Sequence, residues 1–161
     1  MAYLDVLLNY VEGMHTTSSA VSKLLPFAAE ASWTTGRWDT LQKYLSQAPP
    51  ATGGDFNISV GRTLLALHQG DSEGFKSIVS TLREQIACSL SPSTTSSLGA
   101  CHDEMLKFHI LTELEMLADP SQMERKELFE TLDRRLEAIG AYLKDKQYLL
   151  GIRRAMMQLH R

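Results

Sequence analysis

The chain has 161 residues, of which 43% are hydrophobic and 22% charged, the size and composition of a globular domain with a packed core. Its formal net charge of −3 is too small to indicate a nucleic-acid partner. No apolar run reaches the roughly 18 residues needed to span a membrane. Two cysteines, Cys88 and Cys101, are too few for a disulfide framework and are expected as reduced thiols. The start of the chain lacks the basic segment of a signal peptide, which favours a cytosolic or nuclear location.

Charge is unevenly distributed along the chain. Residues 121–161 contain nine Lys and Arg against six Asp and Glu, whereas residues 1–120 contain seven against thirteen. The basic C-terminal part therefore either meets an acidic partner surface or forms an ordinary solvated face.

Apolar residues recur at the i, i+3, i+4 and i+7 spacing of amphipathic helices along most of the chain, and no alternating β pattern of useful length appears. Predicted helices cover residues 2–14, 19–34, 37–46, 55–68, 71–90, a long segment from after residue 97 to about 118, 121–139 and 146–160. Breaks rich in polar residues, Pro or Gly separate them at residues 15–18, 47–54 and 91–97.

Local signals mark several helix ends. Asp55 and Asp71 are predicted N-caps, and Gly70 is predicted to end the helix that Asp55 begins. Ser121 and Glu124 have the spacing of a capping box and predict a helix that opens at Ser121. The residues of that helix expected to face inward are Leu128, Phe129, Leu132, Leu136 and Ile139.

The stretch from Trp33 to Leu41 predicts a tight corner between two helices. Gly36 is suited to the positive φ that ends a helix, and Trp33 and Trp38 are expected to pack across the junction. Small residues at positions 28, 29, 31 and 32 permit close approach of a neighbouring helix.

The long helix that ends near residue 118 predicts burial on two sides. Its apolar positions form two stripes, Leu106, Ile110, Leu114 and Leu117 in one and Met105, Phe108 and Leu111 in the other. Helices of this kind are the inner helices of stacked arrays. The predicted fold is therefore all-α, an α-solenoid of seven or eight antiparallel, tetratricopeptide-like hairpin helices. It is expected to form a single helical-repeat segment over residues 1–161.

Four segments carry a family resemblance. The first resembles the FAT region of the phosphatidylinositol-3-kinase-related protein kinases. It consists of Ala28-Ala29-Glu30-Ala31-Ser32-Trp33, followed by Gly36-Arg37-Trp38-Asp39 and then by Leu41 and Tyr44-Leu45. The segments at 61–68, at 109–115 (His-Ile-Leu-Thr-Glu-Leu-Glu) and at 149–156, with its Arg-Arg pair, resemble later helices of that region. The Arg-Arg pair favours the ATR branch, the checkpoint kinase of replication stress and DNA damage. Only a few residues separate that branch from the mTOR branch.

The resemblance implies a non-catalytic piece of a much larger kinase. In that family the region is a helical solenoid that clasps the kinase domain. The implied partners are the kinase domain, neighbouring repeats of the same polypeptide and a regulatory protein subunit, with a nuclear location and no direct contact with nucleic acid or membrane. The chain has no Gly-rich phosphate loop, strand lysine or catalytic-loop aspartate in context, so ATP and magnesium are expected only in the kinase domain of the parent.

Polar residues with candidate chemistry have simpler structural explanations. His109 and Glu113 lie four apart on a helix, but two ligands do not make a metal site without a third, and a hydrogen-bonded packing role is expected. Arg153 and Arg154 can each pair bidentately with a carboxylate across an interface; alternatively they are solvated or pair within the domain. No catalytic, cofactor-binding or metal-binding residue is predicted.

Two functional hypotheses remain open. In the first, the segment is a regulatory scaffold of a checkpoint kinase, held together by Trp33, Trp38, Leu41 and Leu114, with Asp39 at its corner. In the second, it is a free-standing tetratricopeptide-like adaptor that binds a peptide or protein partner in a groove.

Overall fold

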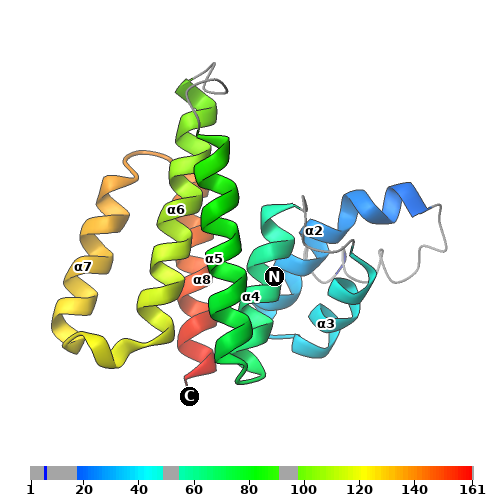
Figure 1. Cartoon of the computed structure of the whole chain (residues 1–161), viewed down its shortest axis with the longest axis horizontal. Helices are drawn as coiled ribbons and strands as arrows, with labels where there is room; N and C mark the ends of the chain where they lie inside the picture. Colours follow the sequence, from blue (N-terminus) through cyan, green and yellow to red (C-terminus); the bar gives the residue numbers. More distant parts are fainter. Residues whose placement is uncertain (1–5, 7–17, 49–54, 91–97, 161) are drawn as a thin grey trace. The chain divides into compact units, whose positions relative to one another are not determined.

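The computed structural model describes residue 6 and residues 18–48, 55–90 and 98–160, and every regular element in these ranges is helical. The elements are α2 (Ser18–Thr35), α3 (Trp38–Gln47), α4 (Phe56–His68), α5 (Ser72–Ser89), α6 (Leu98–Ala118), the short 3-10 helix η1 (Pro120–Gln122), α7 (Arg125–Ala138) and α8 (Leu143–Leu159) (Figure 1). The predicted all-α, solenoid-like fold is confirmed. The predicted helix over residues 2–14 lies outside the described residues, apart from residue 6. So do residues 15–17 of the predicted break at 15–18, residues 49–54 of the break at 47–54, and the break at 91–97.

The chain folds as two compact units, residues 1–78 and residues 79–161, and each has its own buried apolar residues. Helix α5 contributes residues 72–78 to the first unit and residues 79–89 to the second. The expectation of a single helical-repeat segment over residues 1–161 stays a prediction.

Small side chains set the spacing of helices in the first unit, where α2 packs against both α3 and α4. Ala29 and Ser32 of α2 are fully buried, and the Ser32 hydroxyl donates to the Ala28 carbonyl at 2.7 Å. On α4, a Cβ added at Gly61 would lie 3.3 Å from Leu41 Cδ1 of α3 and 3.8 Å from Ala29 Cβ. The lack of a side chain at Gly61 therefore lets α4 lie close to both other helices.

Glycines with positive φ end three helices, since Gly36, Gly70 and Gly140 have φ values of 73°, 74° and 73°. At the first corner the Gly36 N–H donates to the Trp33 carbonyl at 3.3 Å, and the Arg37 N–H donates to the carbonyl five residues back at 2.9 Å. These two bonds form a Schellman motif, which satisfies carbonyls that the helix end leaves unpaired. The predicted roles of Gly36 and Gly70 are confirmed.

Two predicted N-caps are also confirmed. The Asp55 carboxylate accepts a hydrogen bond from the Asn57 N–H at 2.8 Å, and the Asp71 carboxylate accepts one from the Gly74 N–H at 2.8 Å. Each carboxylate satisfies a backbone donor of the first helical turn, and its charge suits the positive end of the helix dipole.

In the second unit α6 packs against α7 and α8. Its buried apolar residues are Ile110, Leu111, Leu114 and Leu117. The prediction of two fully covered stripes is wrong at Met105, which is 50% exposed near the start of the helix. Helix α8 begins at Leu143, three residues before the predicted start, and the Tyr142 ring lies 4.3 Å from the ring of His102 on α6.

The helix predicted over residues 121–139 does not begin at Ser121, so its predicted start is wrong. Pro120 opens the 3-10 turn η1, the Ser121 hydroxyl bonds to the Asp119 carboxylate, and α7 begins only after Glu124, whose side chain makes no capping bond. The fixed φ of Pro120 and the competing acceptor on Asp119 together remove Ser121 from a capping role. Phe129, predicted to face inward, is 42% exposed.

Candidate functional site

The corner at Gly36 joins one fully buried aromatic residue to one half-buried one. Trp33 is only 1% exposed, and Leu41 of α3 is fully buried. Trp38, expected to pack across the junction, is half-buried, and its ring stacks on His68 of α4 with centroids 4.7 Å apart and planes 14° apart. The corner therefore ties α3 to α4 through an aromatic stack at its edge.

The remaining predicted corner residue, Asp39, is exposed in the first turn of α3. A carboxylate at this place interacts favourably with the positive end of the helix dipole. This corner has the features of a structural joint rather than of a reactive site.

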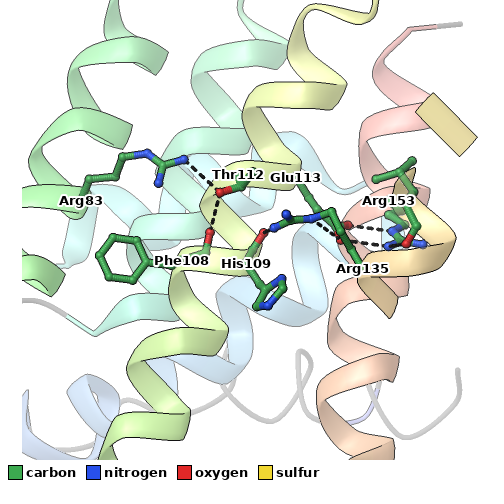
Figure 2. A network of polar contacts seen from close by, with 8 residues as sticks. Arg83, Phe108, His109, Thr112, Glu113, Arg135 and Arg153 are labelled. Atoms are coloured by element: carbon green, nitrogen blue, oxygen red, sulfur yellow. Dashed lines mark hydrogen bonds and ion pairs between the residues drawn. The ribbon is translucent and has the colours of Figure 1, made fainter. Parts of the chain in front are cut away.

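The main polar feature of the second unit is a buried carboxylate on α6. Glu113 has no exposed surface. Arg153 of α8 donates two parallel hydrogen bonds to its carboxylate, from Nε to Oε2 at 2.7 Å and from Nη2 to Oε1 at 2.9 Å (Figure 2). Bidentate pairs of this geometry are the strongest class of side-chain hydrogen bond. Because both partners are withdrawn from water, each depends on the other for the neutralisation of its charge.

Three further contacts bring α7 into the same cluster. Arg153 Nη2 also donates to the Leu132 carbonyl of α7 at 2.7 Å. Arg135 of α7 donates from Nη2 to the His109 carbonyl at 3.2 Å, and its Nε lies 3.5 Å from Glu113 Oε1 (Figure 2). One carboxylate and two guanidinium groups thus connect α6, α7 and α8, and they are referred to below as the Glu113 cluster.

His109 lies beside this cluster on α6. Burial lowers the pKa of His109, the positive charge of Arg135 lowers it further, and the negative charge of Glu113 acts in the opposite direction. Within the described residues its Nδ1 is buried without a hydrogen-bond partner. The native structure therefore favours the neutral imidazole at this position.

The cluster does not have the arrangement of a metal or acid–base site. Both carboxylate oxygens of Glu113 accept from Arg153, and the residue has no exposed surface. Across the described residues no group of three or more His, Cys, Asp or Glu is placed to hold a metal ion. A carboxylate locked between two guanidinium groups stabilises structure and is not poised to move a proton.

A second cross-helix pair links α5 and α6 at residues that belong to the second unit. The Arg83 guanidinium bonds to the Thr112 hydroxyl at 3.2 Å, and the Thr112 hydroxyl donates to the Phe108 carbonyl at 2.9 Å (Figure 2). The same guanidinium bonds to the Glu115 carboxylate. Polar side chains of α6 therefore face neighbouring helices on more than one side. This pair is partly exposed, so we expect it to contribute less than the Glu113 cluster.

The neighbouring arginines Arg153 and Arg154 take different places, because successive helical positions point about 100° apart. Arg153 pairs within the domain, whereas Arg154 is exposed. Leu114 is fully buried on α6.

Arg135 and Gly61 were not singled out from the sequence. A lone glycine on the apolar face of a helix was a usable signal for Gly61, but nothing in the sequence distinguishes Arg135 from the exposed Arg134 beside it.

These features define a helical-hairpin scaffold whose polar residues are used for packing. The family model of the FAT domain matches residues 25–161, and the chain belongs to this family. FAT domains form a helical scaffold region of phosphatidylinositol-3-kinase-related kinases, so this level of the sequence resemblance is confirmed. In the part of the chain that the structure describes, no helix is both long and apolar enough to cross a membrane.

Proposed function

We propose that this chain is a non-catalytic scaffold segment of an ATR-like serine/threonine protein kinase that acts in the DNA-damage and replication checkpoint in the nucleus. The observation that supports a scaffold role is the Glu113 cluster, in which one buried carboxylate ties three helices together within the FAT-domain match. Helices joined in this way shift together, so a movement imposed on one of them is passed to the others.

In this proposal the partners are the kinase domain and neighbouring helical repeats of the same polypeptide, together with a regulatory protein subunit. ATP and magnesium bind only in the kinase domain of the parent, and the segment contacts neither nucleic acid nor membrane. The Arg153-Arg154 pair in its helical context supports the ATR branch over the mTOR branch.

The first test is the sequence of the transcript on both sides of this segment. Kinase motifs several hundred residues downstream support the proposal. A stop codon directly after Arg161 refutes it and supports the alternative, a free-standing tetratricopeptide-like adaptor.

The second test uses the full parent protein with Arg153→Met, compared at equal protein level with the double variant Glu113→Leu/Arg153→Met. We expect the single variant to reduce phosphorylation of substrates after a replication block, and the double variant to restore it because no buried charge is left unpaired. Full activity of the single variant would refute the scaffold role. Activity that does not respond to a replication block would refute the ATR assignment alone.

A further inference from the structure

Helix α7 buries little of its surface in the second unit. Of its 14 residues, Leu128 and Leu132 are buried, whereas α8 buries five of its 17 residues. Eight of the 14 residues of α7 are charged. A helix of this length draws most of its stability from packing rather than from its own backbone. The position of α7 therefore depends strongly on its polar contacts with the other helices.

The polar contacts that join α7 to α6 and α8 meet at the Glu113 cluster. Arg153 donates to the Leu132 carbonyl of α7, and Arg135 of α7 donates in turn to a carbonyl of α6. The third contact is longer, because Arg135 Nε lies 3.5 Å from Glu113 Oε1 and, within the described residues, is buried without a hydrogen-bond partner.

Release of α7 leaves the central ion pair of the cluster intact. Both carboxylate oxygens of Glu113 accept from Arg153, so Arg135 can move into solvent without leaving Glu113 unpaired. Detachment of α7 breaks two bonds from arginines to backbone carbonyl groups and separates no bidentate charge pair. Detachment of α8 would break that pair, which is the costlier event.

Both ends of α7 are joints at which the chain leaves the helical conformation. Before α7, Met123 and Glu124 are extended, with ψ values of 144° and 141°. After α7, Gly140 has a φ of 73°, and no atom lies within 4 Å of a Cβ added there. These joints link α7 to η1 and α6 at one end and to α8 at the other (Figure 1). Rotation at such positions moves a helix without unwinding it.

We propose that α7 is a detachable helix, which opens away from α6 and α8 by breaking the two arginine–carbonyl bonds while α6 and α8 stay packed. For its role this device rests on the proposed scaffold function. Closed, α7 passes a movement on to the other two helices, and open, it does not. If α7 proves inseparable, the scaffold function still stands, with the three helices moving as one body.

Native-state hydrogen exchange of the 161-residue chain, followed by mass spectrometry of peptic fragments, measures the opening of each helix. In the parent chain we expect the amides of α7 to be at least about tenfold less protected than those of α8. Low concentrations of urea should accelerate exchange in α8 more than in α7, because the opening of α7 alone exposes less surface than global unfolding does.

Two matched variants test the contact that holds α7. Arg135→Met removes the bond to the His109 carbonyl and leaves the buried ion pair in place. We expect it to lower the protection of α7 at least about tenfold, the effect of one hydrogen bond from a charged group, and to leave α8 within about twofold. Arg134→Met is the control, because both bonds of the Arg134 guanidinium are made within α7 itself. Circular dichroism of each variant verifies that the helices are retained.

Two results would overturn the proposal. The first is equal protection of α7 and α8 in the parent chain with the same dependence on urea, because the helices would then open only together. The second is an equal change in the protection of α7 in the Arg135 and Arg134 variants, because Arg135 would then not hold the helix in place.

Discussion

Replacement of Arg153 by Met tests the energetic role of the Glu113 cluster directly. Met has a similar length and fills the space with little steric change, but it removes both hydrogen bonds to the Glu113 carboxylate and the bond to the Leu132 carbonyl. Glu113 would remain fully buried, with only Arg135 Nε at 3.5 Å as a charged neighbour. Loss of one member of a buried ion pair costs about 3–5 kcal/mol, and we expect the free energy of unfolding to fall by this amount.

The double variant Glu113→Leu/Arg153→Met separates the cost of an unpaired charge from the cost of altered packing. It removes the buried carboxylate together with its main partner, and Arg135 can turn toward solvent because its side chain is already 22% exposed. The Leu132 carbonyl still loses a donor, which costs about 1–3 kcal/mol. We therefore expect the double variant to be more stable than Arg153→Met alone.

Urea unfolding followed by far-UV circular dichroism measures these differences. An Arg153→Met variant whose free energy of unfolding lies within about 1 kcal/mol of that of the parent would refute the reasoning, because an unpaired buried carboxylate destabilises the folded state by more than this. A double variant less stable than the single one would also refute it, since packing rather than charge pairing would then dominate.

Three further predictions concern single positions. Gly61→Val should lower stability by about 1–3 kcal/mol in thermal unfolding, because the added side chain meets Leu41 Cδ1 near 3.3 Å, and an unchanged melting temperature would contradict the close approach. Gly70→Ala should cost about 1–2 kcal/mol through its φ of 74° alone, since no atom lies within 4 Å of the added Cβ, whereas the control Gly99→Ala in α6 should be neutral or stabilising. The lowered pKa of His109 means that the unfolded chain binds more protons there, so stability should fall as pH decreases below about 6.5. His109→Gln should make that decrease smaller in urea titrations between pH 7 and pH 5, and an unchanged or steeper decrease would contradict it.

Helix positions were predictable wherever the deciding signal is local. A glycine at position 36 or 70 ends its helix because few other residues adopt positive φ, and Asp55 and Asp71 cap their helices with bonds to residues two and three positions away. Predictions based on one local pattern failed where a neighbour competed. The capping box at Ser121 has the correct spacing, but the preceding Pro and Asp redirect both the backbone and the hydroxyl.

The candidate site was only partly predictable, because its contacts join residues far apart in sequence. Glu113 and Arg153 were each singled out, but their pairing spans 40 positions and depends on how α6 and α8 pack. Arg135 could not be distinguished from Arg134 without knowing which face of α7 meets α6. The exposure of Phe129 has the same origin, since helical spacing alone cannot show which apolar position of α7 the neighbouring helices leave uncovered.

The Glu113 cluster also constrains how sequences of this family can diverge. An acidic residue at position 113 is tolerated only with an arginine at position 153, since lysine cannot make two parallel bonds to one carboxylate. Substitutions at these two positions should therefore occur together, with an apolar residue at one accompanied by an apolar residue at the other. Position 135 should vary more freely, because its arginine makes the longer contact with the carboxylate and reaches solvent. Aligned FAT domains should show strong covariation between 113 and 153 and weaker covariation of either with 135.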